Sequence, residues 1–153
     1  IREAIESDEM LILPDFRKKE ILKLLEESPD VSISRSTEQL TWGVPVPNDG
    51  TQVMYVWIDA VLGYVTNTMR LAEEKGLNWE DFWKEGNNNK IYMCHGKDNI
   101  MFHSIILNAL LLGQKENYHL VDTIVSAEYL NFNDQKFSKS KGIGMTFFAG
   151  STS

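Results

Sequence analysis

The chain of 153 residues is 42% hydrophobic and 24% charged, with a formal net charge of −7 at pH 7. This length suits about one domain with its own core, and no apolar run approaches the roughly 18 residues of a membrane span. The acidic N-terminus lacks the basic start and apolar stretch of a signal peptide, so we expect a cytoplasmic protein with no membrane contact. Cys94 is the single cysteine and the three histidines are widely spaced, which excludes an internal disulfide and predicts no zinc site.

Charge is distributed unevenly along the chain. All 22 acidic residues and 12 of the 15 basic residues precede Lys136, so residues 1–135 carry −10 and residues 136–153 carry +3. A surface this acidic is a poor general binder of nucleic acid. We therefore expect any anion to bind near the basic C-terminal stretch.

The first predicted element is an amphipathic helix that begins at Pro14 and Asp15 and ends before Pro29. The sequence VSISR at residues 31–35 then alternates as a strand does, with Arg35 on the same face as two β-branched residues. An arginine in that position is either an edge charge with a buried stem or a ligand contact, and the residues alone favour the edge charge. The prolines of the following WGVPVP (42–47) predict an extended segment outside the centre of a sheet.

A strand-to-helix unit follows. The apolar run 53–58 predicts a strand, Asp59 the cap of a helix, and Gly76 the end of that helix. On one helix face, Ala60 and a glycine leave a notch that Tyr64 walls and that Trp57, at the end of the strand, can close. The notch is either ordinary packing of a helix on a sheet through small residues, or a binding site.

A second unit of the same kind begins at residue 91. Residues 91–95 predict a strand, Gly96 a tight turn, and Asp98 the cap of a helix that is apolar nearly all round. Asn99, His103 and Leu107 are spaced by four, so they place an amide and an imidazole on one face of that helix. His103 is either a core histidine bonded to a carbonyl or part of a ligand site, since a strand ending at a glycine before a helix marks the ligand-facing edge of open α/β sheets.

The sequence VDTIVSAEYL (121–130) supplies a third apolar strand. Three strands joined through helices of about 12 residues or more predict parallel pairing with right-handed crossovers, which is the doubly wound α/β plan. A ligand should then lie at the carboxyl ends of the strands, where Trp57, residues 95–96 and the segment after Ala127 converge.

The basic stretch NDQKFSKSKGIG (133–144) is rich in ammonium groups and hydroxyls, from Lys136, Ser138, Lys139, Ser140 and Lys141. Such groups suit a polyphosphate, because flexible lysines can follow charge that moves during a reaction. A loop of this kind is also common as solvated surface, and the stretch alone does not separate the two interpretations.

Together and in this order, these segments resemble the second half of the catalytic domain of the methionyl-tRNA synthetases, which are class I aminoacyl-tRNA synthetases. KFSKS (136–140) resembles the KMSKS signature, with Phe137 in place of methionine. The other matching segments, between about Ile33 and Gly144, are WGVPVP (42–47), YVWIDAVLGY (55–64), HGKDNIMFHS (95–104) and EYLNFNDQKFSKSKG (128–142). The sequence of the last segment resembles that of the eukaryotic cytosolic members of the family more than that of the bacterial members.

The resemblance implies a fold and a domain organisation. The implied fold class is α/β, the second half of a doubly wound (Rossmann-like) parallel sheet with helices on both faces. Residues 1–32 would be a linker and helix leading back from an insertion domain, and residues 33–153 the second half of the catalytic domain.

The resemblance also implies roles for individual residues. The methionine pocket would be lined by Trp57, Ala60, Tyr64, Asn99 and His103. ATP would be bound by Gly96, Asp98, Lys136, Ser138 and Lys139, and the catalytic side chains would be Lys136, Lys139 and Arg35. The implied reaction is activation of methionine with Mg-ATP to methionyl-adenylate, followed by transfer to tRNA(Met).

One signature of the class, His-x-Gly-His, is absent, because none of the histidines His95, His103 and His119 forms it. We therefore expect a fragment that needs the N-terminal half of the catalytic domain as a partner and that has no activity alone. Two alternatives are a non-catalytic module that binds a nucleotide or a partner chain, and a sibling synthetase for leucine, isoleucine or valine. A dehydrogenase is disfavoured, because no GxGxxG follows a strand.

Overall fold

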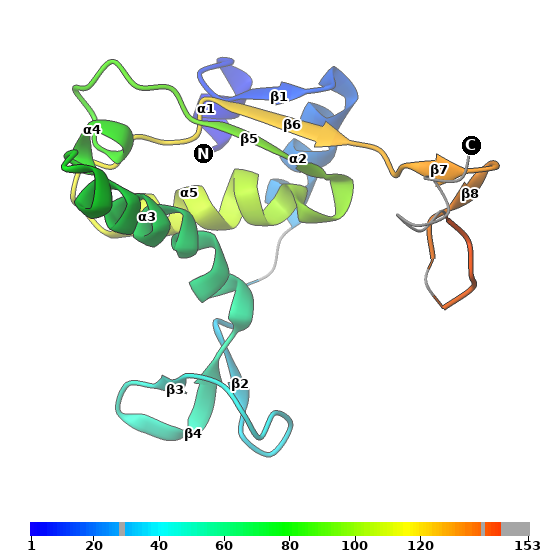
Figure 1. The fold of residues 1–153 in the computed structure, drawn as a ribbon, viewed down its shortest axis with the longest axis horizontal. Helices are drawn as coiled ribbons and strands as arrows, with labels where there is room; N and C mark the ends of the chain where they lie inside the picture. The colour runs from blue at the N-terminus through cyan, green and yellow to red at the C-terminus, as the bar shows by residue number, and fades with distance from the viewer. Residues whose placement is uncertain (28–29, 139, 145–153) are drawn as a thin grey trace.

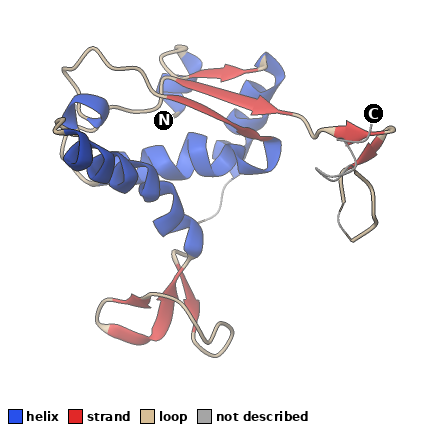
Figure 2. Cartoon of the chain, in the orientation of Figure 1, coloured by secondary structure: helices blue, strands red, loops and turns tan. Residues whose placement is uncertain are grey.

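The structure, a computed structural model, describes residues 1–27, 30–138 and 140–144. Figure 1 and Figure 2 show a parallel sheet with most of the helices beside it, a small antiparallel sheet at one end of the longest helix, and a short hairpin near the C-terminus. Lys139, one of the residues predicted to bind ATP, lies outside the described residues.

The parallel sheet has the strand order β1 (Leu11–Leu13), β6 (Thr123–Ala127), β5 (Tyr92–Gly96). Ile12 pairs with Ile124, and Ile124 pairs with Met93 on its other side. All three side chains are buried in the main core, as expected for strands covered by helices. The predicted α/β class and its parallel sheet are confirmed.

The second sheet is antiparallel and projects from the start of the longest helix (Figure 1). Its order is β2 (Ser34–Ser36), β4 (Asp49–Met54), β3 (Pro45–Val46). Of the strand predicted at residues 53–58, only Val53 and Met54 are in a strand, and that strand, β4, belongs to the antiparallel sheet. The third strand of the parallel sheet is β1, which was not predicted. With three residues β1 is too short to show a pattern, while β4 buries Val53 alone and so cannot serve as a core strand.

The longest helix, α3 (Val56–Lys75), begins earlier than predicted. Trp57 lies in its first turn rather than at a strand end, and Asp59 does not cap it, because the residue before the helix is Tyr55. The buried face of the helix includes Ile58, Val61 and Val65. Their helical spacing explains the difference, since burying that face outweighs the strand preference of the apolar run. Gly76 ends the helix in the left-handed conformation (φ 66°), as predicted.

Before β5, three further helices lie along the described chain: one before β1, one after β1 and one between α3 and β5. They are α1 (Arg2–Glu6), α2 (Asp15–Glu27) and α4 (Glu80–Trp83). α2 confirms the predicted amphipathic helix, with Arg17 and Ile21 buried. Within the described ranges, no helix has the length and apolar character needed to cross a bilayer.

Between β5 and β6 the chain forms a 3-10 helix (Lys97–Asn99), a π-helical turn (Phe102–Ile106), here called the π-turn, and α5 (Leu107–Gly113). Asp98 makes no capping hydrogen bond, so that prediction is wrong. Its carboxylate instead accepts a hydrogen bond from the hydroxyl of Tyr129. Leu107, predicted to share the polar stripe, is fully buried in the core.

Beyond the carboxyl end of β6 the chain continues into a hairpin of β7 (Asn131–Phe132) and β8 (Gln135–Lys136). Figure 1 shows this hairpin extending past the edge at which β5 and β6 end. The basic stretch thus starts next to the carboxyl edge of the parallel sheet.

Candidate active site

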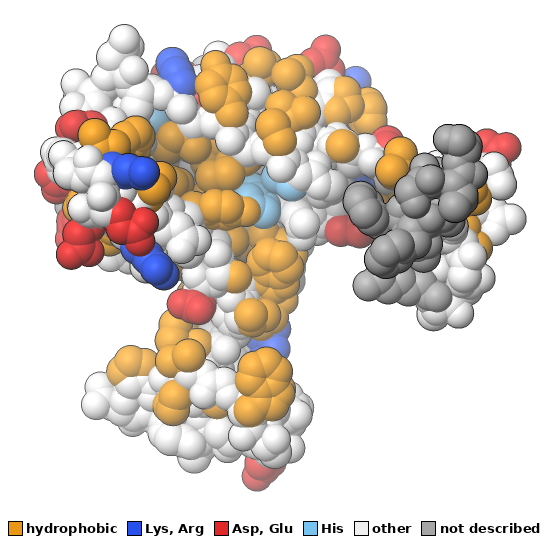
Figure 3. All heavy atoms as spheres, in the orientation of Figure 1, with side chains coloured by type: hydrophobic (Ala, Val, Ile, Leu, Met, Phe, Trp, Pro, Cys, Tyr) orange, Lys and Arg blue, Asp and Glu red, His pale blue; other side chains and the backbone are white. Residues whose placement is uncertain are grey.

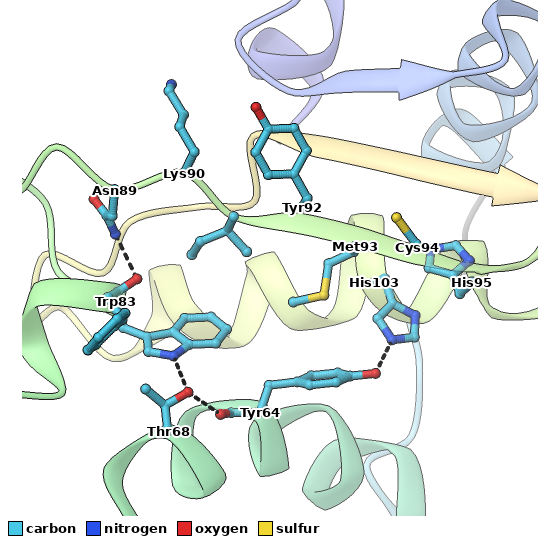
Figure 4. Close-up of a pocket in the computed structure, with 12 residues that line it drawn as sticks. Tyr64, Thr68, Trp83, Asn89, Lys90, Tyr92, Met93, Cys94, His95 and His103 are labelled. Carbon is cyan, nitrogen blue, oxygen red and sulfur yellow. Dashed lines mark hydrogen bonds between the residues drawn. The ribbon is translucent and has the colours of Figure 1, made fainter. Parts of the chain in front are cut away.

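A buried imidazole and a phenol meet between the π-turn and α3. The Nδ1 of His103 donates to the carbonyl oxygen of Asn99 (2.8 Å), and its Nε2 accepts a hydrogen bond from the hydroxyl of Tyr64 (2.9 Å; Figure 4). Both ring nitrogens are satisfied when the imidazole is neutral with its proton on Nδ1. The predicted helix notch and the predicted polar stripe therefore face each other.

The buried side chain of Asn108, which was not predicted to have a role, stabilises the π-turn by hydrogen bonds. The amide of Asn108 is fully buried, donates to the carbonyl oxygens of His103 (2.9 Å) and Ser104 (3.0 Å), and accepts from the backbone N–H of Val121 (2.9 Å). One amide thus supplies hydrogen-bond donors to two carbonyls of the widened turn and also connects this turn to the segment before β6. A lone asparagine inside an apolar helix was the available signal.

An aromatic stack joins the first turn of α3 to the π-turn. The Trp57 ring stacks on Phe102, the residue before His103, with ring centroids 4.2 Å apart and an interplanar angle of 15°. Ala60, one turn further along α3, is exposed. The described contact of Trp57 is thus with Phe102, while Asn99 contributes a backbone carbonyl to the Tyr64–His103 pair.

A cavity of about 450 Å³ opens next to the same pair, and its lining includes Tyr64, Trp83, Met93, His95 and His103 (Figure 4). Figure 3 shows histidine atoms there among hydrophobic side chains. Trp57, Ala60 and Asn99 do not line it.

His95, expected near a ligand at the strand ends but assigned no role there, also belongs to this group. Its ring stacks on His103 with centroids 4.5 Å apart, and its Nδ1 donates to the carbonyl of Gly96 (3.1 Å). Burial lowers the pKa of His95 below its ordinary value, and the adjacent His103 lowers it further. Its Nε2 is buried and has no hydrogen-bond partner among the described residues. The stacked rings of His95 and His103 thus line one part of the cavity.

A second group of side chains lies at the carboxyl ends of β5 and β6, where Gly96 pairs with Ala127. The ammonium of Lys136 lies 3.5 Å from the centroid of the Tyr129 ring, and the ammonium of Lys97 lies 4.4 Å from it. The hydroxyl of Tyr129 donates a hydrogen bond to Asp98. The structure therefore brings together three of the residues predicted to bind ATP: Gly96, Asp98 and Lys136.

Glu128 joins this group to the N-terminal part of the chain. It accepts hydrogen bonds from Lys97 (2.8 Å) and from Arg17, whose guanidinium also donates to Glu20 (2.6 Å). The hydrogen bond from Lys97 lowers the pKa of Glu128 against the effect of desolvation. The contacts among Arg17, Lys97 and Glu128 were not predicted, because α2 and the end of β6 come together only in the fold.

The basic stretch continues past β8 in a short bridge. The backbones of Ser138 and Ile143 exchange two hydrogen bonds (2.9 and 3.0 Å), and the hydroxyl of Ser138 lies 3.2 Å from that of Ser140. The backbone of Ser138, another residue predicted to bind ATP, is thus held by a described contact.

Arg35 lies elsewhere, on β2 of the antiparallel sheet. Its guanidinium lies over the ring of Tyr55 at 4.0 Å and donates to the carbonyls of Ser32 and Ser34. It also borders an apolar cavity of about 510 Å³ that Trp42 helps to line. None of the contacts described for Arg35 reaches Tyr64 or His103.

A parallel sheet with helices beside it, and with lysines and polar side chains at its carboxyl edge, is typical of nucleotide-binding α/β domains. A family model described as tRNA synthetases class I (M) matches residues 1–149, so the chain belongs to that family. Within the class its similarity is to methionyl-tRNA synthetases.

Three relatives illustrate this similarity. The cytoplasmic methionine–tRNA ligase of Xenopus laevis is 44% identical over 111 residues, which are 71% of this chain and 12% of the relative. The methionine–tRNA ligase of Saccharolobus solfataricus is 45% identical over 118 residues, which are 74% of this chain and 20% of the relative. A crystal structure of Mycobacterium tuberculosis methionyl-tRNA synthetase bound by methionyl-adenylate has a TM-score of 0.70 at 25% identity and covers 93% of this chain and 26% of its own.

The chain thus spans only 12% to 20% of the length of these curated relatives. A frog and an archaeal relative are almost equally similar, so these identities do not single out the eukaryotic branch.

Proposed function

We propose that the chain is the second half of the catalytic domain of a methionine–tRNA ligase, which activates methionine with ATP and transfers it to tRNA(Met). The observation that carries this proposal is the segment 96–103. At one end Gly96 and Asp98 lie with the lysines at the sheet edge, and at the other His103 bonds Tyr64 beside an aromatic cavity. One short segment thus joins an anion-binding group to an apolar site.

The apolar part suits methionine. Trp57, Tyr64, Phe102 and His103 supply aromatic faces and edges for an unbranched thioether, and sulfur–aromatic contacts of this kind contribute about 0.3–1.5 kcal/mol each. In this proposal Ala60 and Asn99 complete the pocket. Arg35 is assigned to methionine activation by resemblance alone, since its described contacts lie within the antiparallel sheet.

The edge group suits Mg-ATP. Gly96 is exposed and allows close approach of a sugar, and the Asp98 carboxylate can accept hydrogen bonds from ribose hydroxyls. Lys136, Ser138 and Lys139 are proposed to follow the triphosphate and to stabilise the charge that develops on pyrophosphate.

The proposed chemistry consists of two transfers. The methionine carboxylate attacks the α-phosphorus of ATP and pyrophosphate leaves, giving methionyl-adenylate. A hydroxyl of the terminal adenosine of tRNA then attacks the methionyl carbonyl and AMP leaves. The chain's own residues position the reactants and stabilise charge, and none of them serves as a covalent nucleophile.

The proposed partner is the first half of the catalytic domain, which would carry His-x-Gly-His. β5 is an edge strand in the described part of the chain, and Tyr92 on it is 64% exposed. An edge strand of a parallel sheet can accept a further strand from a partner. In this organisation residues 1–32 form the connection from an insertion domain, residues 33–153 form the second half, and the enzyme acts in the cytoplasm.

The direct test is methionine-dependent ATP–pyrophosphate exchange. The chain alone is expected to show none, and co-expression with a first half carrying His-x-Gly-His should restore it. In the restored enzyme Lys139→Ala should slow exchange by about 100-fold or more, as for a group acting on developing charge. No exchange in the co-expressed pair, or undiminished exchange in its Lys139→Ala variant, would contradict the proposal.

A substitution in the pocket provides the test for methionine. Tyr64→Phe leaves the Nε2 of His103 without its donor, so the KM for methionine should rise by roughly fivefold, the factor for about 1 kcal/mol. The KM for ATP should not change, and Thr66→Ala on an exposed face of α3 serves as the control. If Tyr64→Phe raised the KM for ATP instead, the assignment of the two sites would be wrong.

A further inference from the structure

We propose that Tyr129 is a positioning residue: its ring holds the ammonium of Lys136 at the sheet edge, and its hydroxyl orients Asp98 for the nucleotide. This inference rests on the proposed function, because it assigns a role at the site where ATP is proposed to bind. Tyr129 is half-buried and follows the carboxyl end of β6 by two residues.

The contacts of Tyr129 connect two elements. Its hydroxyl donates to Asp98, two residues after the end of β5, and its ring lies against Lys136, the last residue of β8. Figure 1 shows that this hairpin otherwise extends away from the sheet. The side chain therefore couples the position of the hairpin to the position of the Asp98 carboxylate.

The two lysines on the ring differ in their charge partners. Lys97 forms an ion pair with Glu128 at 2.8 Å, whereas no ion pair with an acidic residue is found for Lys136 in the described part of the chain. The attraction of an aromatic face for a cation is weaker than that of a phosphate. Lys136 is thus held near the edge by a contact that an arriving triphosphate can replace, while Lys97 stays in place.

The Tyr129 hydroxyl acts on the carboxylate itself. A hydrogen bond to Asp98 fixes its direction and occupies one oxygen, which leaves the other oxygen for a ribose hydroxyl. Without the ring and the hydroxyl, Lys136 and Asp98 carry opposite charges at the same edge and are expected to pair directly. Such a pair would have to break before ATP could bind.

The placement can be tested in the chain itself by NMR of lysines that carry ¹³C-methyl groups, with the Lys136 signal assigned by its loss in Lys136→Arg. The ring current should shift this signal upfield in the wild type and in Tyr129→Phe, and the shift should disappear in Tyr129→Leu. Addition of ATP should abolish the shift in the wild type. An equal shift in the wild type and Tyr129→Leu would overturn the placement.

The functional role is tested in the enzyme restored with a first half. Tyr129→Leu should raise the KM for ATP by about tenfold and Tyr129→Phe by about threefold, with the KM for methionine unchanged. A rise of both KM values together, or of neither, would overturn the role of Tyr129. Absence of exchange in the wild-type enzyme would instead overturn the proposed function, and the ATP titration by NMR would still decide the inference.

A matched control is available at another aryl–ammonium contact. The ammonium of Lys84 lies over the ring of Tyr118 at 3.8 Å, away from the sheet edge. Tyr118→Leu removes a comparable contact and should change neither the Lys136 signal nor the KM for ATP. A change as large as that in Tyr129→Leu would show a general effect of losing such a contact and would overturn the inference.

Discussion

His95 and His103 stack on each other although each side chain can carry a proton. The nitrogens of His103 are committed to Asn99 and Tyr64, and the Nε2 of His95 is buried without a partner among the described residues. Burial and the adjacent imidazole both disfavour a charge on His95, so its pKa is lowered. The stability of the folded chain is therefore expected to depend on the protonation of His95.

The lowered pKa of His95 gives the sign of that dependence. Below about pH 6.5 the unfolded chain binds a proton at this residue that the folded chain resists, so stability falls as the pH falls and levels off below the folded pKa. Urea unfolding at about pH 7.5 and about pH 5.5 should show a smaller loss in His95→Gln than in the wild type. Equal losses in the two proteins would show that another group titrates.

Some individual residues of the site could be predicted from the sequence, and others could not. Tyr64 and His103 could be predicted because each stands out by spacing on its own helix, and the structure joins them. Tyr129 and Glu128 could not, because their partners lie on elements that meet only after folding. Pairwise contacts between distant elements leave no local periodicity.

The π-turn is the element that presents His103 to the site. An α-helix that widens for a single turn leaves backbone carbonyls without their usual partners, and here the buried Asn108 supplies donors to two of them. The same side chain accepts the N–H of Val121. The turn is therefore stable only with this amide in place.

Replacing that amide should be costly. Asn108→Ala leaves two carbonyls and one N–H buried without partners, and each such loss costs about 1–3 kcal/mol without being additive, so a decrease of about 3 kcal/mol in the free energy of unfolding is expected. Urea denaturation measures it. Asn87→Ala, at an exposed asparagine that also bonds two carbonyls, should lose about 0.5 kcal/mol. Similar losses at both positions would contradict the role of Asn108.

Elements with a long apolar periodicity were predictable, and short ones were not. The helix at α2, the strand at β5 and the glycine end of α3 follow their sequence signals. β1 was missed because three residues carry no period, and the start of α3 was misplaced because an apolar run of six residues fits a strand and a helix equally well. Packing of the helical face decided between them.

The whole molecule has an uneven distribution of buried surface. The parallel sheet and α5 share the main core, whereas the three strands of the antiparallel sheet bury only Val53 among their own residues. Figure 1 shows that sheet projecting from the start of α3. Burial of apolar area is the main source of stability, so the projecting sheet should open more easily than the core.

Hydrogen exchange measured by mass spectrometry tests this difference. Amides of β2, β3 and β4 should exchange faster than those of β5, β6 and α5 by roughly tenfold or more, because they open without unfolding the core. Uniform protection of both sheets would show that they unfold together. The comparison is between backbone amides that belong to hydrogen-bonded strands or to the helix α5.

The uncovered side of β5 has a consequence for handling the chain. Along that side the peptide groups of Tyr92–Gly96 have no strand neighbour among the described residues, and such a row pairs with any extended polypeptide that reaches it. In concentrated preparations two copies can meet edge to edge, which starts aggregation. Yield and monodispersity should therefore improve when the cognate half is produced in the same cell.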